Sequence, residues 1–260
     1  MMRIDRRRLL KMTLLATLDL TRKHPLFAAL ASASPSDVLE PGAALAAGRW
    51  AMVIDLKKCL AARDCHDACI HACCDSHNLP DIANNKHEVK WIWKELGEHL
   101  FPGQLDEYRG AELARQPVPA LCNHCANPPC TRVCPTGATF KRPDGIVVMD
   151  PHRCIGCRFC MAACPYGSRS FNWEDPRPHL SKINPDYPTR TKGVVEKCTF
   201  CDERLARGKL PACVAACPVH AMTFGDLKDH KSPVAKLLND HYSICRKPEL
   251  GTEPGVYYLV

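Results

Sequence analysis

The chain has 260 residues, of which 18 are cysteine, 22 proline and 14 glycine. So many cysteines exclude an ordinary globular protein, and the chain is much longer than small disulfide-stapled domains. The formal net charge is +7, but residues 1–33 hold seven basic and two acidic residues and account for +5 of it. With no basic stripe elsewhere, the sequence predicts no nucleic-acid partner. The proline and glycine content predicts a loop-rich fold held by metal sites more than by a large core.

The N-terminus resembles a twin-arginine export signal. Residues 5–11 read Asp-Arg-Arg-Arg-Leu-Leu-Lys, with Leu9 where the consensus has phenylalanine. Ala31-Ser32-Ala33 suits signal cleavage, although charged residues from Asp19 to Lys23 leave the apolar stretch too short to span a bilayer. The alternative is a basic tail. We expect an export signal at 1–33 and a linker at 34–49.

Sixteen of the cysteines fall into four groups of four. The third group has the Cys-x2-Cys-x2-Cys-x3-Cys-Pro spacing of bacterial ferredoxins, in which three thiolates on one loop bind a [4Fe–4S] cluster and the fourth serves its neighbour. The second and fourth groups open with Cys-x2-Cys and close with Cys-x3-Cys-Pro. In chain order the groups are Cys59, Cys65, Cys69 and Cys73; Cys122, Cys125, Cys130 and Cys134; Cys154, Cys157, Cys160 and Cys164; and Cys198, Cys201, Cys213 and Cys217.

The first group is irregular, because its gaps are five, three and three residues. Cys74 competes with Cys73 for the fourth place, and we choose Cys73 because its x3 gap matches the other groups. Cys245 and Cys74 are then structural or free thiols. Zinc sites or disulfides are the alternative for all four groups, but zinc ribbons use separated Cys-x2-Cys pairs.

Four groups of four thiolates predict four [4Fe–4S] clusters. If the fourth cysteine of each group serves a partner cluster, as in two-cluster ferredoxins, the groups must pair. Pairing the middle groups joins Cys122, Cys125 and Cys130 with Cys164, and Cys154, Cys157 and Cys160 with Cys134. Pairing the outer groups joins Cys198, Cys201 and Cys213 with Cys73, and Cys59, Cys65 and Cys69 with Cys217.

The expected fold is α+β, with two bacterial-ferredoxin-like halves, one inserted in the other. The expected divisions are an outer half at 50–117 and 190–230 with an insertion at 79–117, an inner half at 118–172, a connecting loop at 173–189 and a C-terminal tail at 231–260.

Several local elements are also expected. The strands Trp50–Asp55 and Val147–Asp150 each lead through an aspartate and a basic residue into a cysteine group, which is an internal repeat. Pro143-Asp144-Gly145 predicts a hairpin turn. Trp91 and Trp93 are expected to pack over a cluster or a partner, with ligand stacking as the weaker alternative. Tyr257–Val260 is either a terminal strand or a docking tail.

Nothing in the sequence indicates catalysis. It has no dinucleotide-binding glycine motif, no P-loop and no Cys-x-x-Cys-His. Four histidines lie among the cysteines, and with four complete cysteine sets we expect them to tune clusters, dock partners or contact solvent rather than bind metal: His66, His71, His77 and His124. Electron transfer without catalysis is the function that four neighbouring clusters predict.

The four-group arrangement resembles the four-cluster ferredoxin-type subunits of polysulfide reductase, formate dehydrogenase and periplasmic hydrogenase over residues 50–230. Within them it is similar to the DsrO family of the DsrMKJOP complex of dissimilatory sulfur metabolism. The phrases that carry this likeness are 77–80, 86–93, 122–125, 152–160, 169–173 and 193–198.

The resemblance implies a periplasmic subunit that is peripheral on the membrane. It would relay electrons between a multihaem cytochrome c, or another periplasmic partner, and an integral-membrane quinone-interacting subunit of the polysulfide-reductase type. The alternative is the iron-sulfur beta subunit of a molybdopterin oxidoreductase or a hydrogenase.

The export signal gives a direct test. Replacing Arg6 and Arg7 by lysine should leave the protein in the cytoplasm, because the twin arginines are what the exporting receptor reads. Cell fractionation and immunoblotting measure the distribution, and replacing the nearby Arg3 by lysine is the control. Unchanged export of the double variant would show that residues 1–33 are not a twin-arginine signal.

Overall fold

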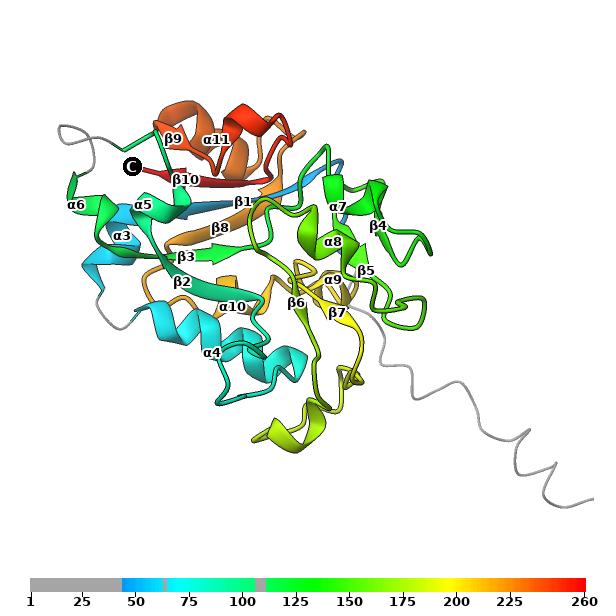
Figure 1. Cartoon of the computed structure of the whole chain (residues 1–260). Coiled ribbons are helices and arrows are strands. Elements are labelled where there is room, and N and C mark those ends of the chain that lie inside the picture. The colour runs from blue at the N-terminus through cyan, green and yellow to red at the C-terminus, as the bar shows by residue number, and fades with distance from the viewer. Residues whose placement is uncertain (1–43, 63–64, 106–110) are drawn as a thin grey trace, which may run out of the picture. The chain divides into compact units, whose positions relative to one another are not determined.

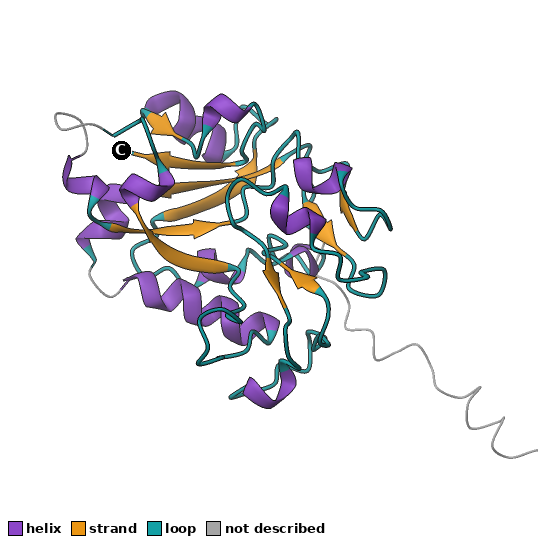
Figure 2. Cartoon of the chain, viewed as in Figure 1, coloured by secondary structure: helices purple, strands orange, loops and turns teal. Residues whose placement is uncertain are grey.

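The computed structural model describes residues 44–62, 65–105 and 111–260, without the side chains of Cys65 and His66. The expected export signal and most of the linker lie outside these residues. The described part mixes short helices, short strands and long loops (Figure 2). None of its helices is long and apolar enough to cross a membrane.

A four-stranded sheet joins segments from both ends of the described chain (Figure 1). The strand order is β8-β1-β10-β9. β10 runs parallel to β1, while β8 pairs with β1 and β9 pairs with β10 in antiparallel fashion. Their bounds are β1 Trp50–Asp55, β8 Met222–Asp226, β9 Ser243–Ile244 and β10 Val256–Leu259.

Alternation along the strands gives this sheet two apolar faces. Ala51 and Val53 face α11 (Pro233–Asp240), where they form a small cluster with Val234. The Ser232 hydroxyl caps α11 by accepting a hydrogen bond from Ala235 N at 3.1 Å. Met52, Ile54 and Tyr258 belong to the opposite face and to the main core.

The main core is larger than the composition suggested. It extends from the sheet over the antiparallel pair β2–β3 and the long helix α4. Strands distant in sequence assemble a continuous apolar layer, and the expectation that metal sites hold the fold more than this core does stays a prediction. The elements around it are α3 Leu56–Ala61, α4 Cys65–His77, β2 Ile92–Leu96, α5 Gly97–Leu100, α6 Ala111–Ala114 and β3 Pro117–Leu121.

The middle of the chain folds into two small hairpins and several single helical turns. The expected turn at 143–145 does join two antiparallel strands, β4 and β5. β6 and β7 form a second two-stranded pair. The bounds are α7 Pro129–Arg132, β4 Thr139–Lys141, β5 Val147–Met149, α8 Phe159–Ala162, β6 Ser170–Phe171, η2 Arg177–His179, β7 Val195–Glu196, α9 Asp202–Leu205, α10 Ala212–Ala215 and η3 Pro248–Leu250.

In both copies of the internal repeat, the aspartate accepts a backbone hydrogen bond from a residue that follows the strand. Asp55 ends β1 and accepts a hydrogen bond from Lys58 N at 3.1 Å, which starts α3. Asp150 follows β5 and accepts one from His152 N at 2.9 Å. Each aspartate thus turns the chain from a strand into a cysteine group.

Of the two alternatives for the chain end, the terminal strand is confirmed, because β10 lies between β1 and β9. Trp91 and Trp93 are both buried. Trp91 donates to Glu196 at 3.2 Å and packs against His77, while Arg246 lies over the Trp93 ring. Both rings are part of the protein interior, so neither offers a face for stacking a ligand.

Because β10 lies at the centre of the sheet, we expect that truncating its buried tyrosine will strongly destabilise the protein. Tyr258 is fully buried, donates to Pro119 O at 3.1 Å and packs edge-on against Phe101. Tyr258→Ala should lower the free energy of unfolding by about 3–5 kcal/mol, as for other buried aromatic truncations. Thermal unfolding followed by circular dichroism measures the loss.

Tyr242→Ala is the matched control, because Tyr242 is 75% exposed. Its effect should stay within about 0.5 kcal/mol. Equal destabilisation by both variants would contradict the central role of β10.

Candidate iron-sulfur cluster sites

Four cysteines from two different groups line one cavity in the middle of the chain. They are Cys122, Cys125 and Cys130 of the second group and Cys164 of the third, and we call them site 3. The rest of the wall is mostly apolar, with Val147, prolines and Tyr166, and includes one cation, Arg169. A set of four sulfurs without a carboxylate suits a thiolate-bound, anionic iron-sulfur cluster.

A second cavity repeats this arrangement with the roles exchanged. Cys154, Cys157 and Cys160 of the third group line it together with Cys134 of the second, and we call these residues site 4. Met149 and Val195 close the wall. The exchange of fourth cysteines between sites 3 and 4 is the geometry that the two-cluster ferredoxin pattern requires.

Site 2 combines the fourth group with the first. Cys198, Cys201 and Cys213 are buried, and their charges, after burial itself, raise the pKa of Cys73. Cys74 has other neighbours, since after burial the charges of Asp75 and Asp81 raise its pKa. The structure therefore turns Cys73, and not Cys74, toward the fourth group.

Site 1 takes the remaining cysteines. Cys59 and Cys217 lie in one buried cluster with Ala221, and Cys69 is buried on α4. Cys59 stands on α3. The side chain of Cys65 lies outside the described residues. Ligation by the sixteen sulfurs stays a prediction, for which the structure supplies the positions.

The Cys-x2-Cys loops share one backbone feature. In each of them the residue before the second cysteine has a positive φ: 42° at His124, 70° at Gly156 and 56° at Phe200. This left-handed conformation turns the loop tightly enough for both sulfurs to face one side. At Gly156 a Cβ would also lie 2.5 Å from Gly193 O, so glycine is needed there.

Short helical turns present the last two cysteines of each of these groups. α7 carries Cys130 and packs on α8, which carries Cys160, and α10 with Cys213 packs on α4. Each turn ends just before the fourth cysteine, which therefore faces across to the partner helix. The third residue beyond the fourth cysteine is again left-handed in all three groups: Gly137, Gly167 and His220.

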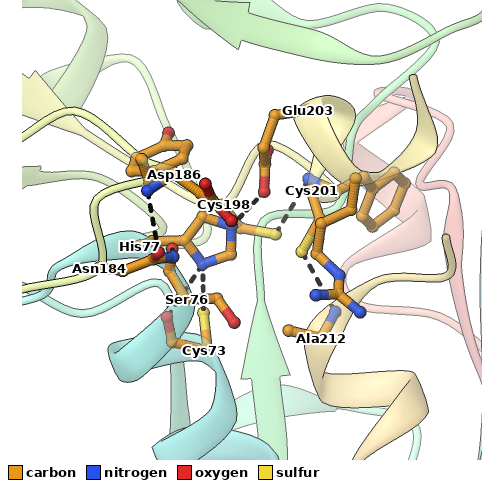
Figure 3. Close-up of polar contacts among 12 residues, drawn as sticks. Cys73, Ser76, His77, Asn184, Asp186, Cys198, Cys201, Glu203 and Ala212 are labelled. Atoms are coloured by element: carbon orange, nitrogen blue, oxygen red, sulfur yellow. Dashed lines mark hydrogen bonds and ion pairs between the residues drawn. The ribbon is translucent and has the colours of Figure 1, made fainter. Parts of the chain in front are cut away.

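His77 is built into the wall of site 2 (Figure 3). Its Nδ1 lies 2.9 Å from Cys73 O and its Nε2 lies 3.1 Å from Glu203 Oε1. His77, Glu203 and Cys201 present ligand atoms within 4.8 Å of one another, as a small metal site would. Cys201 already belongs to site 2, and both ring nitrogens of His77 have partners. We therefore interpret His77 as a residue that positions α4 against α9.

His124 is also a structural residue. It is fully buried, stacks on Phe200 with ring centroids 3.7 Å apart, and accepts a hydrogen bond from Val147 N at 3.1 Å on Nδ1. Burial, with the charges of Lys197 and Arg169, holds its pKa well below the usual range, so the ring is neutral. The stack ties the loop of the second group to that of the fourth. His71 is exposed, and the side chain of His66 lies outside the described residues.

The thiols change protonation when they bind metal. Burial raises the pKa of Cys125 and of Cys198 to about 12, with neighbouring cysteines adding to the effect. Cys134 differs, because backbone and side-chain hydrogen bonds around Thr136 and Thr139 outweigh its slight burial and lower its pKa. Metal ligands must be thiolates, so filling the buried sites releases protons to solvent.

Contacts between the cysteine-bearing elements give the order of the four sites: α4 packs on α10, His124 of the second group stacks on Phe200 of the fourth, and α7 packs on α8. The charge of Cys69 in site 1 raises the pKa of Cys213 in site 2. The charge of Cys122 in site 3 raises the pKa of Cys198 in site 2. The charge of Cys130 in site 3 raises the pKa of Cys160 in site 4. In each case burial is the largest cause, and the neighbour's charge raises the pKa further. The order is therefore site 1, site 2, site 3, site 4.

Comparison with known families supports this chemistry. A family model described as a 4Fe-4S dicluster domain matches residues 114–179 and 183–227. These ranges contain the second, third and fourth cysteine groups.

Several curated relatives match over 81% of the chain. The Hdr-like menaquinol oxidoreductase iron-sulfur subunit 1 of Archaeoglobus fulgidus is 41% identical over 229 residues, which cover 82% of that protein. The menaquinone reductase iron-sulfur cluster-binding subunit of Nitratidesulfovibrio vulgaris is 36% identical, with 88% covered. A tetrathionate reductase subunit of Salmonella typhimurium is 38% identical, with 72% covered.

The exchanged cysteines give a crossed prediction. Cys164→Ser should remove or alter the cluster signal of site 3, whereas Cys160→Ser, only four residues away, should affect site 4. Each serine removes one thiolate of a different set of four. Electron paramagnetic resonance at stepped potentials, with clusters assigned from a structure of the loaded protein, measures which signal changes.

Cys74→Ser is the control and should leave all signals unchanged, because Cys74 does not face site 2. Loss of the same signal in the Cys160 and Cys164 variants would reject the exchange.

Proposed function

Because the chain belongs to the family of 4Fe-4S dicluster iron-sulfur subunits of oxidoreductase complexes, we propose that it carries four [4Fe–4S] clusters and relays electrons through a membrane-associated complex. The observation that carries this proposal is that the four cysteine sites are successive neighbours, from site 1 through sites 2 and 3 to site 4. A line of neighbouring redox sites has two ends, as a relay between two partners needs.

Like its relatives, the chain is an electron-transfer subunit and not a catalytic one. A bound [4Fe–4S] cluster supplies one-electron redox chemistry. The protein's own residues hold the clusters and exclude water from them, since every described cysteine of sites 1 and 2 is buried. Backbone N–H groups also donate to sulfur, from Phe200 to Cys198 and from Ala212 to Cys201, both at 3.4 Å. Such hydrogen bonds set cluster potentials.

Site 4 is the end of the line nearest to solvent. Cys134, Cys154 and Cys157 are only partly buried. Ile155 and Phe159 beside them are 66% and 60% exposed. We assign electron exchange with one partner to site 4, and exchange with the other to site 1.

The halves of the protein are nested in this proposal. Residues 50–117 and 190–230 form an outer ferredoxin-like half around the inner half at 118–172. The pairing of β1 with β8 and the contact of Cys59 with Cys217 support this, because both join the two outer segments.

We assign the complex to the periplasmic side of the membrane and to dissimilatory sulfur metabolism, as in the DsrO family. The twin-arginine match and the DsrO-like phrases of the sequence support these assignments. The partners are then an integral-membrane quinone-interacting subunit and a multihaem cytochrome c. The quinone partner has further support, because two relatives are named as menaquinol oxidoreductase and menaquinone reductase subunits.

A second function is a subunit that serves a molybdopterin oxidoreductase. The observation in its favour is the likeness to two relatives, each 38% identical. One is named as a putative dimethyl sulfoxide reductase iron-sulfur subunit and the other as a tetrathionate reductase subunit. The two functions share the relay and differ in the partner at one end.

Purification of the native complex under anaerobic conditions tests the proposal. The chain should contain about sixteen irons, from four clusters of four irons each. Mass spectrometry should find a quinone-interacting membrane subunit and a multihaem cytochrome among the co-purifying proteins.

An iron content near twelve per chain would indicate that site 1, with its irregular spacing, lacks a cluster. Co-purification of a molybdopterin subunit without a cytochrome would favour the second function. A colourless protein with zinc would reject both.

A further inference from the structure

A buried arginine lies in the wall between sites 3 and 4. Arg169 is only 5% exposed and lines the cavity of site 3. Its Nη2 donates to Thr139 Oγ1 at 2.7 Å, which fixes the guanidinium against β4. Its Nη1 lies 4.0 Å from Met149 Sδ, and Met149 lines the cavity of site 4. The guanidinium thus lines the cavity of site 3 and contacts a residue that lines the cavity of site 4.

The charge of Arg169 has no carboxylate partner among the described residues. A buried cation is costly unless an opposite charge lies near it. Arg190, which is equally buried, has such a partner in Glu196 at 2.8 Å. Arg169 instead has cysteines: Cys130 and Cys122 of site 3 and Cys160 of site 4.

These cysteines compensate for the burial. Burial alone would lower the pKa of Arg169, yet Cys130, Cys160 and Cys122 raise it overall. The opposite charge that Arg169 needs is therefore divided between two cysteine sites.

We propose that Arg169 is a positioning residue shared by sites 3 and 4, whose fixed positive charge favours the reduced state at both. The inference rests on the proposed function, since it requires clusters in these sites. Reduction adds one negative charge to a site, and a cation in a low-dielectric wall stabilises that charge more strongly than one in water.

The sharing determines which steps Arg169 controls. Because its charge acts on both sites, it raises both potentials and changes the difference between them little. One electron leaves one site and enters the other, and the guanidinium keeps all its protons throughout. Arg169 therefore leaves the potential difference between sites 3 and 4 nearly unchanged, while it raises both potentials relative to that of site 2.

The experiment replaces Arg169 in the full, cluster-loaded protein. Arg169→Met removes the charge and keeps most of the length, whereas Arg169→Lys keeps the charge. Arg169→Met should lower the equilibrium constant for reduction about tenfold at each of sites 3 and 4, which is about 59 mV for a one-electron couple. Sites 1 and 2 should not shift, and Arg169→Lys should recover most of the effect.

Redox titration followed by electron paramagnetic resonance gives these potentials, with site 3 identified through Cys164→Ser. The matched control is Arg153→Met. Arg153 is next to Cys154 in site 4, but its side chain is 65% exposed and pairs with Asp150 at 3.3 Å. Solvent screens its charge, so the control should shift site 4 by less than twofold.

Measuring the iron content distinguishes a failure of the proposed function from a failure of the inference about Arg169. If the wild-type protein lacks clusters in sites 3 and 4, the proposed function fails first. If Arg169→Met keeps its iron but neither potential moves, or if Arg153→Met moves site 4 equally, the inference is overturned.

A variant that loses its iron is also informative. Arg169→Gln is neutral but still donates to Thr139, so it provides the potentials if the methionine variant does not assemble. If both neutral variants lose the clusters of sites 3 and 4 while Arg169→Lys keeps them, the positive charge is required there, which supports the inference. If Arg169→Lys loses them too, the role of Arg169 is one of shape, and the inference is overturned.

Discussion

Each cysteine site draws its sulfurs from two separate segments, and the arrangement of the cysteine loops depends on this constraint. Cys164 completes site 3 although it follows the loop of site 4, and Cys134 completes site 4 although it follows the loop of site 3. A metal group bound this way cross-links the chain, so that its binding free energy becomes folding free energy. The helix pairs α7–α8 and α4–α10 are the rigid elements that bring the two segments of each site together.

Charge compensation follows from the same arrangement. Bringing sixteen potential thiolates together in a small protein creates a strongly negative interior once they are deprotonated. Two of the buried cations lie where this charge is shared: Arg169 near sites 3 and 4, and Lys197 beside Cys198, whose carbonyl oxygen accepts from Nζ at 2.7 Å. Lys197 also donates to Val147 O on the wall of site 3. These two cations therefore lie between neighbouring sites rather than at single sites.

The sequence predicted the cysteine sites better than the fold, for a physical reason. Ligand spacing is local, and residues four apart on a helix share a face, which puts Cys69 and Cys73 on one side of α4. Cys74 is rotated by about 100° from Cys73 on such a helix, so the choice between them was available from the sequence. The hairpin at 143–145 was equally local, since proline, aspartate and glycine encode a turn directly.

What the sequence did not predict depends on contacts between distant segments. No motif marks β10 as a central strand parallel to β1, because a four-residue apolar stretch pairs equally well at an edge or in a centre. The roles of His77 and Arg169 were missed for the same reason. Glu203 and Thr139, their partners, lie 126 and 30 residues away along the chain. Only the folded chain shows that these polar side chains are buried and partnered.

The left-handed residues of the cysteine loops show how the fold and the clusters support each other. His124 and Phe200 are not glycines, so their positive φ angles cost of order 1 kcal/mol each. Their stacking on one another offsets part of that cost and joins the loops of sites 3 and 2. Metal ligation supplies the remainder, because it holds the flanking sulfurs on one side of each loop. The sheet and its core need no such support, since their strands are extended and their side chains are apolar. The cysteine loops are therefore the part of the fold that depends on the clusters, and the sheet is the frame that keeps the loops close enough to bind them.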